Sequence, residues 1–162
     1  MPTWEFVSGG LTSFGTVAVT RYHPLSGSPG ADPTESLTQT KIYSSYTWTN
    51  LYVVCTNASG GDFTVRSRIG AAFGNMIITI TTTTGIFQDT VNTDSLVDGS
   101  LIDFEVKKLV NGTHTIPLIG STLQDTATNT TLQIAKAQEI AAFAIAFGLT
   151  RFTGIGGLLC NT

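Results

Sequence analysis

The sequence predicts an all-β domain, a sandwich or barrel of short strands joined by hairpins. Between about Thr40 and Lys108 the apolar residues recur at every second position, whereas a helix would give a period of 3.6. Turn residues interrupt this pattern about every ten residues, a spacing typical of such folds. With 162 residues, 41% of them hydrophobic and 12% charged, the chain can bury the core of one domain. This composition excludes a disordered tail or a coiled coil, which need more charge.

The segment 17–25 comes first and predicts a strand that opens the sheet, and the segment 26–33, with two prolines, predicts a surface loop. In residues 62–69, apolar and polar side chains alternate, which places Arg66 and Arg68 together on an outer face. Three further strands are predicted from β-branched, aromatic or alternating residues at 47–56, 76–84 and 101–106. Residues that favour turns bound these strands at 57–61, 70–75, 84–85 and 98–99, where we expect hairpin connections.

The last third of the chain is ambiguous. Residues 132–147 contain helix formers in the middle, but Phe143, Ile145 and Phe147 alternate as they would in a strand. We interpret this segment as a strand, with a helix as the open alternative. We predict one domain at 16–150, preceded by an N-terminal arm at 1–15 and followed by a C-terminal tail at 151–162.

Charge and hydropathy exclude two classes of partner. Eight Lys and Arg against eleven Asp and Glu give a net charge of −3, and the longest basic run is Lys107-Lys108, so we expect no nucleic acid. The most apolar stretch, 140–147, is far shorter than the roughly 20 residues that cross a bilayer, so we expect no membrane partner. The first residues lack the basic start and apolar run of a secretory signal, which predicts synthesis in a cytoplasm.

The sequence contains no recognisable catalytic motif. His23 and His114 are the two histidines, and neither accompanies a nucleophile elbow, a zinc-binding helix or paired carboxylates. Four aspartates between residues 89 and 103 are candidate calcium ligands, but their spacing matches no EF-hand loop and suits turn capping. We therefore predict a protein that is not an enzyme, with no catalytic residue, no metal and no cofactor.

Four central stretches follow one another in the sequence: TNLYVV at 49–54, DFTVRSR at 62–68, GIFQDT at 85–90 with Asn92-Thr93, and VDGSLID at 97–103. Taken in this order, they resemble a family of jelly-roll domains from bacteriophage and environmental sequences. This family is similar to the trimeric heads of complement C1q and tumour necrosis factor. RYHPLSG at 21–27 is similar to the segment that opens such domains. After Lys108 the sequence departs from the pattern, because the closing strand usually follows soon, whereas the next long apolar run is 132–147.

The resemblance implies an antiparallel two-sheet jelly-roll sandwich with extended terminal arms. Such domains are often trimeric and serve in virions as capsid decoration (cement) proteins, fibres or receptor-binding heads. We therefore expect a non-enzymatic structural protein on the capsid surface of a bacteriophage, a homotrimer that binds the major capsid protein and bridges coat subunits. The alternative is the receptor- or glycan-binding head domain of a phage fibre.

The candidate contact residues fall into three groups. The predicted arms offer Trp4, Phe6, Leu158 and Leu159 for docking onto neighbouring subunits. One predicted sheet face offers Arg66, Arg68, Thr79, Thr81 and Thr83. Threonine combines a hydroxyl with an apolar methyl group and brings no charge, which suits the core of an interface. The arginines can pair with Asp103 and Glu105 on a neighbouring strand or subunit. For the alternative function, Tyr46, Trp48 and Tyr52 are the candidates for stacking on a sugar.

Overall fold

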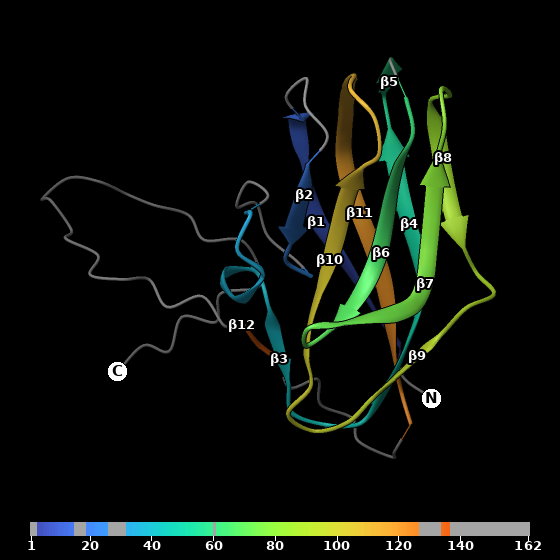
Figure 1. Ribbon diagram of the computed structural model, residues 1–162. Helices are drawn as coiled ribbons and strands as arrows, with labels where there is room; N and C mark the ends of the chain where they lie inside the picture. Colours follow the sequence, from blue (N-terminus) through green and yellow to red (C-terminus); the bar gives the residue numbers. More distant parts are fainter. Residues whose placement is uncertain (1–2, 15–18, 26–31, 60, 127–133, 137–162) are drawn as a thin grey trace, which may run out of the picture.

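The protein is a sandwich of two antiparallel sheets packed face to face (Figure 1). This computed structural model describes residues 3–14, 19–25, 32–59, 61–126 and 134–136. The first sheet has the order β1-β11-β4-β8, built from Thr3–Phe14, Thr113–Asp125, Tyr46–Cys55 and Gly85–Asp89. The short strands β5 (Asn57–Ser59) and β9 (Asp94–Leu96) extend this sheet by pairing with β11 and β4.

The second sheet has the order β12-β3-β10-β6-β7. These strands are Ile134–Lys136, Thr40–Ile42, Leu101–Lys108, Phe63–Ile69 and Ala72–Ile80. Strand β2 (Thr20–His23) also pairs with β10, and a single 3-10 turn, Glu35–Leu37, precedes β3. Along the chain the pairs are nested: β1 with β11, β3 with β10, β4 with β8, and β6 with β7. This nesting is the strand order of a jelly roll, so the predicted antiparallel two-sheet sandwich is confirmed, without the extended N-terminal arm.

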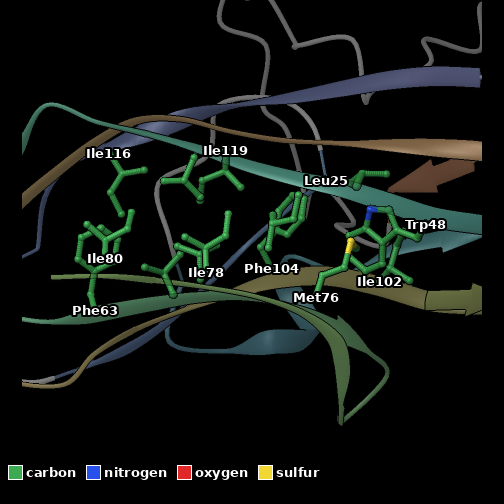
Figure 2. Packing of buried hydrophobic residues seen from close by; sticks show 14 of the residues in the cluster. Leu25, Trp48, Phe63, Met76, Ile78, Ile80, Ile102, Phe104, Ile116 and Ile119 are labelled. Carbon is green, nitrogen blue, oxygen red and sulfur yellow. The ribbon is translucent and has the colours of Figure 1, made fainter. Parts of the chain in front are cut away.

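The core lies between the sheets and is filled by the inward-facing residue of each pleat. Ile102, Phe104 and Val106 of β10 are fully buried, as their alternation predicts. Figure 2 shows Phe63, Ile80 and Ile116 at one end of the core, and at the other end Trp48, Met76 and Ile102.

One bulge in β4 decides which aromatic residues enter the core. Asn50 has a φ of 56°, and the register between β4 and β11 shifts at this position. Because the bulge adds one residue, Trp48 before it and Leu51 after it both face the core, while Tyr52 faces outward. A strand without a bulge would place Trp48 and Tyr52 on the same face.

The closing strand differs from the sequence prediction. It is β11, which begins five residues after Lys108 and pairs with both β1 and β4, whereas the sequence pointed to 132–147. Pro117 hides this strand in the sequence, because proline lacks the N–H that a central strand needs. In the structure Pro117 lies where the partner of β11 changes from β4 to β5. Of 132–147, only β12 is described, and the rest lies outside the described residues.

The N-terminal segment is part of the sandwich. Residues 1–15 were expected to form an arm, but Thr3–Phe14 pairs along β11 as the edge strand β1. The apolar residues of this segment suit a strand as well as a docking arm, which is why composition alone does not separate the two. Deleting this segment would therefore expose the edge of β11 and test folding more than subunit contact. The tail at 151–162 lies outside the described residues.

Gly74 marks a close approach between the two sheets. Ser67 Oγ of β6 donates to Asp94 Oδ2 of β9 at 2.5 Å, and both side chains are buried. A methyl group at Gly74 would overlap both of these atoms. The pair is fixed further by Asn75 N–H, which donates to Asp94 Oδ1 at 2.7 Å.

We therefore expect Gly74→Ala to lower the free energy of unfolding by about 1–3 kcal/mol, since overpacking forces buried groups apart. Chemical denaturation measures this loss. Gly120→Ala is the matched control, because its methyl group would meet the ring of Tyr52, a half-buried side chain that can move outward, so the loss should be smaller. Equal stability of Gly74→Ala and the wild type would contradict the close contact.

Candidate functional site

The side of the sandwich formed by β7 and β8 carries an uncharged surface. These are the edge strands of the two sheets, and they lie side by side (Figure 1). No charged residue occurs between Arg68 and Asp89. Apart from the amides of Asn75 and Gln88, the exposed side chains in this stretch are apolar or carry only a hydroxyl. We call five of them the β7–β8 surface: Ile77, Thr79, Thr81, Thr83 and Ile86.

The three threonines predicted for a sheet face are exposed, but they belong to two kinds of structure. Thr79 lies on the outer side of β7, opposite Thr64 of β6. Strand β7 ends at Ile80, so Thr81 and Thr83 belong to the connection to β8. Ile86 on the outer side of β8 is 70% exposed. The site thus wraps around one edge of the sandwich instead of covering one flat face.

Two carboxylates beneath this surface hold β7 in place: Asp89 links it to β8, and Asp94 links it to β9. Asp89 at the end of β8 accepts the backbone N–H of Ile77 at 2.9 Å, and Asp94 accepts that of Asn75. Burial alone would raise the pKa of Asp89, but hydrogen bonds from Asn92, Ile77 and a third amide lower it overall. Both aspartates thus bind backbone amides, the role in turns and edges that the sequence favoured over calcium binding. Among the described residues, no group of three or more potential ligands is placed to hold a metal ion.

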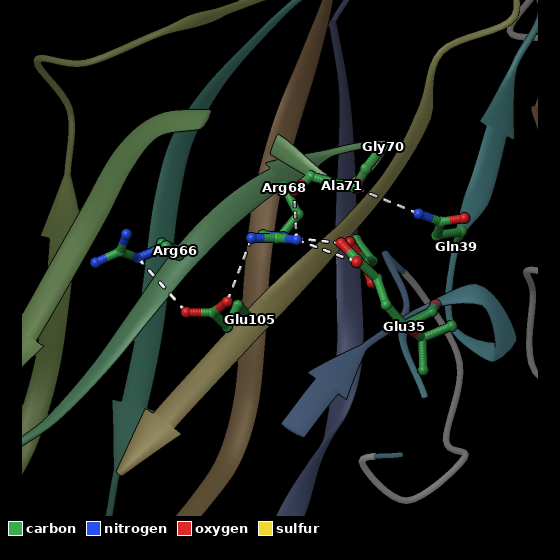
Figure 3. Close-up of polar contacts among 9 residues, drawn as sticks. Glu35, Gln39, Arg66, Arg68, Gly70, Ala71 and Glu105 are labelled. Atoms are coloured by element: carbon green, nitrogen blue, oxygen red, sulfur yellow. Dashed lines mark hydrogen bonds and ion pairs between the residues drawn. The ribbon is translucent and has the colours of Figure 1, made fainter. Parts of the chain in front are cut away.

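Arg66 and Arg68 share the outer face of β6, as predicted, and both approach Glu105 of β10. Arg66 Nε lies 3.8 Å from Glu105 Oε1, and Arg68 Nη1 lies 3.5 Å from Glu105 Oε2 (Figure 3). Their guanidinium carbons lie 4.3 and 4.8 Å from the ring centroid of Phe73, which is 61% exposed. The predicted partner Glu105 is therefore present on the neighbouring strand of the same chain.

Arg68 is not a surface contact, which corrects the prediction for this residue. It is 6% exposed, and it binds Glu35 through Nε at 2.8 Å and Nη2 at 3.1 Å. Its Nη2 also donates to the carbonyl of Ala71 at 2.8 Å. The hydrogen bonds to Glu35 raise the pKa of Arg68, so the guanidinium stays charged. Its role in the chain is to hold the turn that precedes β3.

The predicted sugar-binding residues do not form a site. Tyr46 and Trp48 are fully buried, because they occupy the inward positions of β4 before the bulge at Asn50. Trp48 Nε1 donates to Ser121 Oγ at 2.7 Å, and its ring lies against Phe104. The prediction of a sugar contact is wrong for these two residues.

Tyr52 is the one member of that set that faces outward. Its hydroxyl donates to Glu5 Oε1 of β1 at 2.8 Å, across the place where β11 carries Gly120. Burial and the bond to Glu5 raise the pKa of Tyr52 to about 12, so the hydroxyl keeps its proton at neutral pH. Tyr52 therefore links three strands on the outer side of the first sheet.

The remaining predicted residues add no site. Trp4 and Phe6 lie in β1 opposite Leu123 and Ser121, whereas Leu158 and Leu159 lie outside the described residues. Both histidines are buried. His114 Nε2 lies 2.7 Å from the carbonyl of Gly61, and its ring meets Phe63 edge-on.

The chain matches no protein-family model, and no curated protein matches it at a significant level. No helix in the described part of the chain is long and apolar enough to cross a membrane. Sequence reasoning missed Ile77, Ile86 and Phe73 as exposed apolar residues. The alternation that places Ile78 inward also places Ile77 outward, so this signal was present in the sequence.

Proposed function

We propose that the protein is a non-enzymatic virion structural protein that decorates the capsid of a bacteriophage. In this proposal it forms a homotrimer, binds the major capsid protein on the virion surface and bridges neighbouring coat subunits. Its action is adhesive, because apolar and hydroxyl-bearing side chains pressed against a neighbour make separation of the subunits costly.

The β7–β8 surface is the observation that supports this proposal most directly. Cores of protein interfaces are depleted of charge, and large exposed apolar side chains on one side of a domain mark contact sites. Ile77 is 41% exposed and Ile86 is 70% exposed, and the residues between them bring no charge. The jelly roll adds to this support, since it recurs in viral capsid proteins. The glycan-binding alternative has less support, because two of its three candidate aromatic residues, Tyr46 and Trp48, are buried in the core.

The mass of the isolated protein in solution tests the oligomer. Sedimentation equilibrium of the full chain should give three times the chain mass of 17.1 kDa. A monomer at all accessible concentrations would contradict the homotrimer.

Electron microscopy of native particles that carry the protein tests its location. Density on the capsid lattice, between coat subunits, is the expected result. Density confined to the tail or fibre tips would contradict capsid decoration and would favour a receptor-binding head.

The double variant Ile77→Lys/Ile86→Lys tests the β7–β8 surface itself. Both side chains point outward, so the fold should persist, whereas two desolvated charges should weaken binding to capsids by roughly 30-fold or more. Occupancy of particles that lack the wild-type protein, measured after addition of each variant, reports the effect.

Val97→Lys is the matched control for this variant, because Val97 is also exposed and apolar but lies in the turn before β10. It should bind like the wild type. Full occupancy with the double variant would remove the β7–β8 surface from the proposal.

A further inference from the structure

The turn Glu35–Leu37 lies on the outer face of the second sheet and is tied to it by side chains. Arg68 donates two hydrogen bonds, from Nε and Nη2, to the two carboxylate oxygens of Glu35, and Gln39 Nε2 donates to the carbonyl of Gly70 at 3.3 Å (Figure 3). A further link joins Thr38, directly after the turn, to Asp103 of β10. This last link depends on protonation.

The hydroxyl of Thr38 takes part in two hydrogen bonds and has one proton. Thr38 Oγ1 lies 2.8 Å from the carbonyl oxygen of Glu35 and 2.8 Å from Asp103 Oδ2. A carbonyl oxygen can only accept, so Thr38 must donate to Glu35 if both contacts are hydrogen bonds. The second proton then comes from Asp103, whose neutral carboxyl group donates to Thr38. The geometry therefore matches a protonated Asp103.

The surroundings of Asp103 favour the same protonation state. The side chain is fully buried, and burial raises its pKa to about 7. The nearby carboxylates of Glu35 and Glu105 act in the same direction. Arg68 acts against it, and so does a hydrogen bond that Thr38 would donate to an ionised Asp103.

Two further polar groups lie on this face of the sheet. Tyr22 of β2 lies opposite Glu105, and burial followed by the charge of Glu35 raises the pKa of Tyr22, so it stays neutral. Lys41 of β3 lies opposite Leu101, and its ammonium sits 5.0 Å from the ring centroid of Tyr43. Arg68 lies opposite Asp103 in the pairing of β10 with β6 and favours its ionised form, but its guanidinium already binds Glu35 and the carbonyl of Ala71.

We propose that Asp103 and Thr38 form a proton-dependent latch, which holds the Glu35–Leu37 turn on the sheet while Asp103 is neutral and loosens it when Asp103 ionises. Once Asp103 has lost its proton, both partners of Thr38 can only accept. The single hydroxyl proton of Thr38 can then be donated to Glu35 or to Asp103, but not to both. The new charge is buried close to the carboxylates of Glu35 and Glu105, so water that reaches it through an open turn stabilises it. Displacing the Glu35–Leu37 turn requires less free energy than separating strands, because the turn belongs to neither sheet. The latch is independent of the proposed function.

The sign of the pH effect follows from the raised pKa. An open turn exposes Asp103 and returns its pKa toward the ordinary value of 3.8, so the open state loses its proton first. Opening therefore becomes more favourable as the pH rises from about 4 to about 7, by up to about tenfold per pH unit, and levels off above that range.

Amide hydrogen exchange followed by NMR tests the latch on the full chain. The probe is the N–H of Thr38, which donates to the carbonyl of Glu35 at 2.9 Å. After correction for the intrinsic exchange rate, its protection should fall between pH 4.5 and 7. In Asp103→Asn the side-chain amide can donate to Thr38 but cannot ionise, so the protection should not change with pH. Asp98→Asn, at an exposed aspartate, should behave like the wild type.

Two results would overturn the latch: protection of Thr38 that is constant with pH in the wild type, or an unchanged pH dependence in Asp103→Asn. If Asp103→Asn does not fold, the carboxyl carbon of Asp103 in the wild type still decides the matter. Its chemical shift should titrate near neutral pH, and a midpoint below pH 5 would contradict the proposal.

Discussion

Replacing Trp48 by alanine should lower the free energy of unfolding by about 3–5 kcal/mol. The indole is fully buried, and its ring centroid lies 5.3 Å from that of Phe104. Its removal leaves a cavity between the sheets and deprives Ser121, which is also buried, of the N–H that it accepts. Denaturant unfolding followed by circular dichroism measures the loss.

Tyr52→Phe provides the comparison on the same strand. It removes only the bond from the Tyr52 hydroxyl to Glu5 on the outer face, so the loss should be about 0.5–1.5 kcal/mol. If Trp48→Ala were as stable as Tyr52→Phe, Trp48 could not lie in the core, and the sugar-stacking hypothesis would regain its main residue.

Arg68→Met is the second substitution for which we expect a large effect, a loss of about 3–5 kcal/mol. Methionine keeps the packing of the aliphatic part, but it leaves Glu35 without its cation and Glu105 with only the more distant Arg66. Glu105 is 5% exposed, so its carboxylate cannot be hydrated without opening the structure. Thermal and denaturant unfolding at neutral pH report the change.

Arg66→Met is the matched control, two residues away on the same face of β6. Arg66 is partly exposed, and its Nε is 3.8 Å from Glu105, beyond hydrogen-bond distance. Such a pair contributes less than about 1 kcal/mol. Equal losses for the two variants would mean that the Glu35–Arg68 pair does not stabilise the turn.

The strands that alternate regularly could be predicted from the sequence. Residues 62–69 and 101–106 became β6 and β10, because one face of each is apolar and a shift by one residue would expose it. The antiparallel sandwich followed from these strands and from the turns between them. The β11 strand could not be recognised in this way, since Pro117 and Gly120 break its pattern.

The positions of individual side chains were harder to predict than the strands. The bulge at Asn50 exchanges the inward and outward positions in the second half of β4, and no pattern in the sequence predicts this bulge. The partner of Arg68 is Glu35, 33 positions earlier, and Thr38 binds Asp103 65 positions away. Charge alternation can place Arg68 on a face, but only the fold selects which carboxylate reaches it.

The carboxylates of Asp89 and Asp94 also limit how copies of this chain can associate. An unpaired edge strand invites another chain to add to it through its free N–H and C=O groups, and growth of this kind leads to amyloid-like fibres. On β7 the amides of Asn75 and Ile77 are already occupied by these two side chains. An incoming strand would have to displace two buried carboxylates, so aggregation through this edge is disfavoured. Another protein can then contact this edge through side chains but not by backbone pairing.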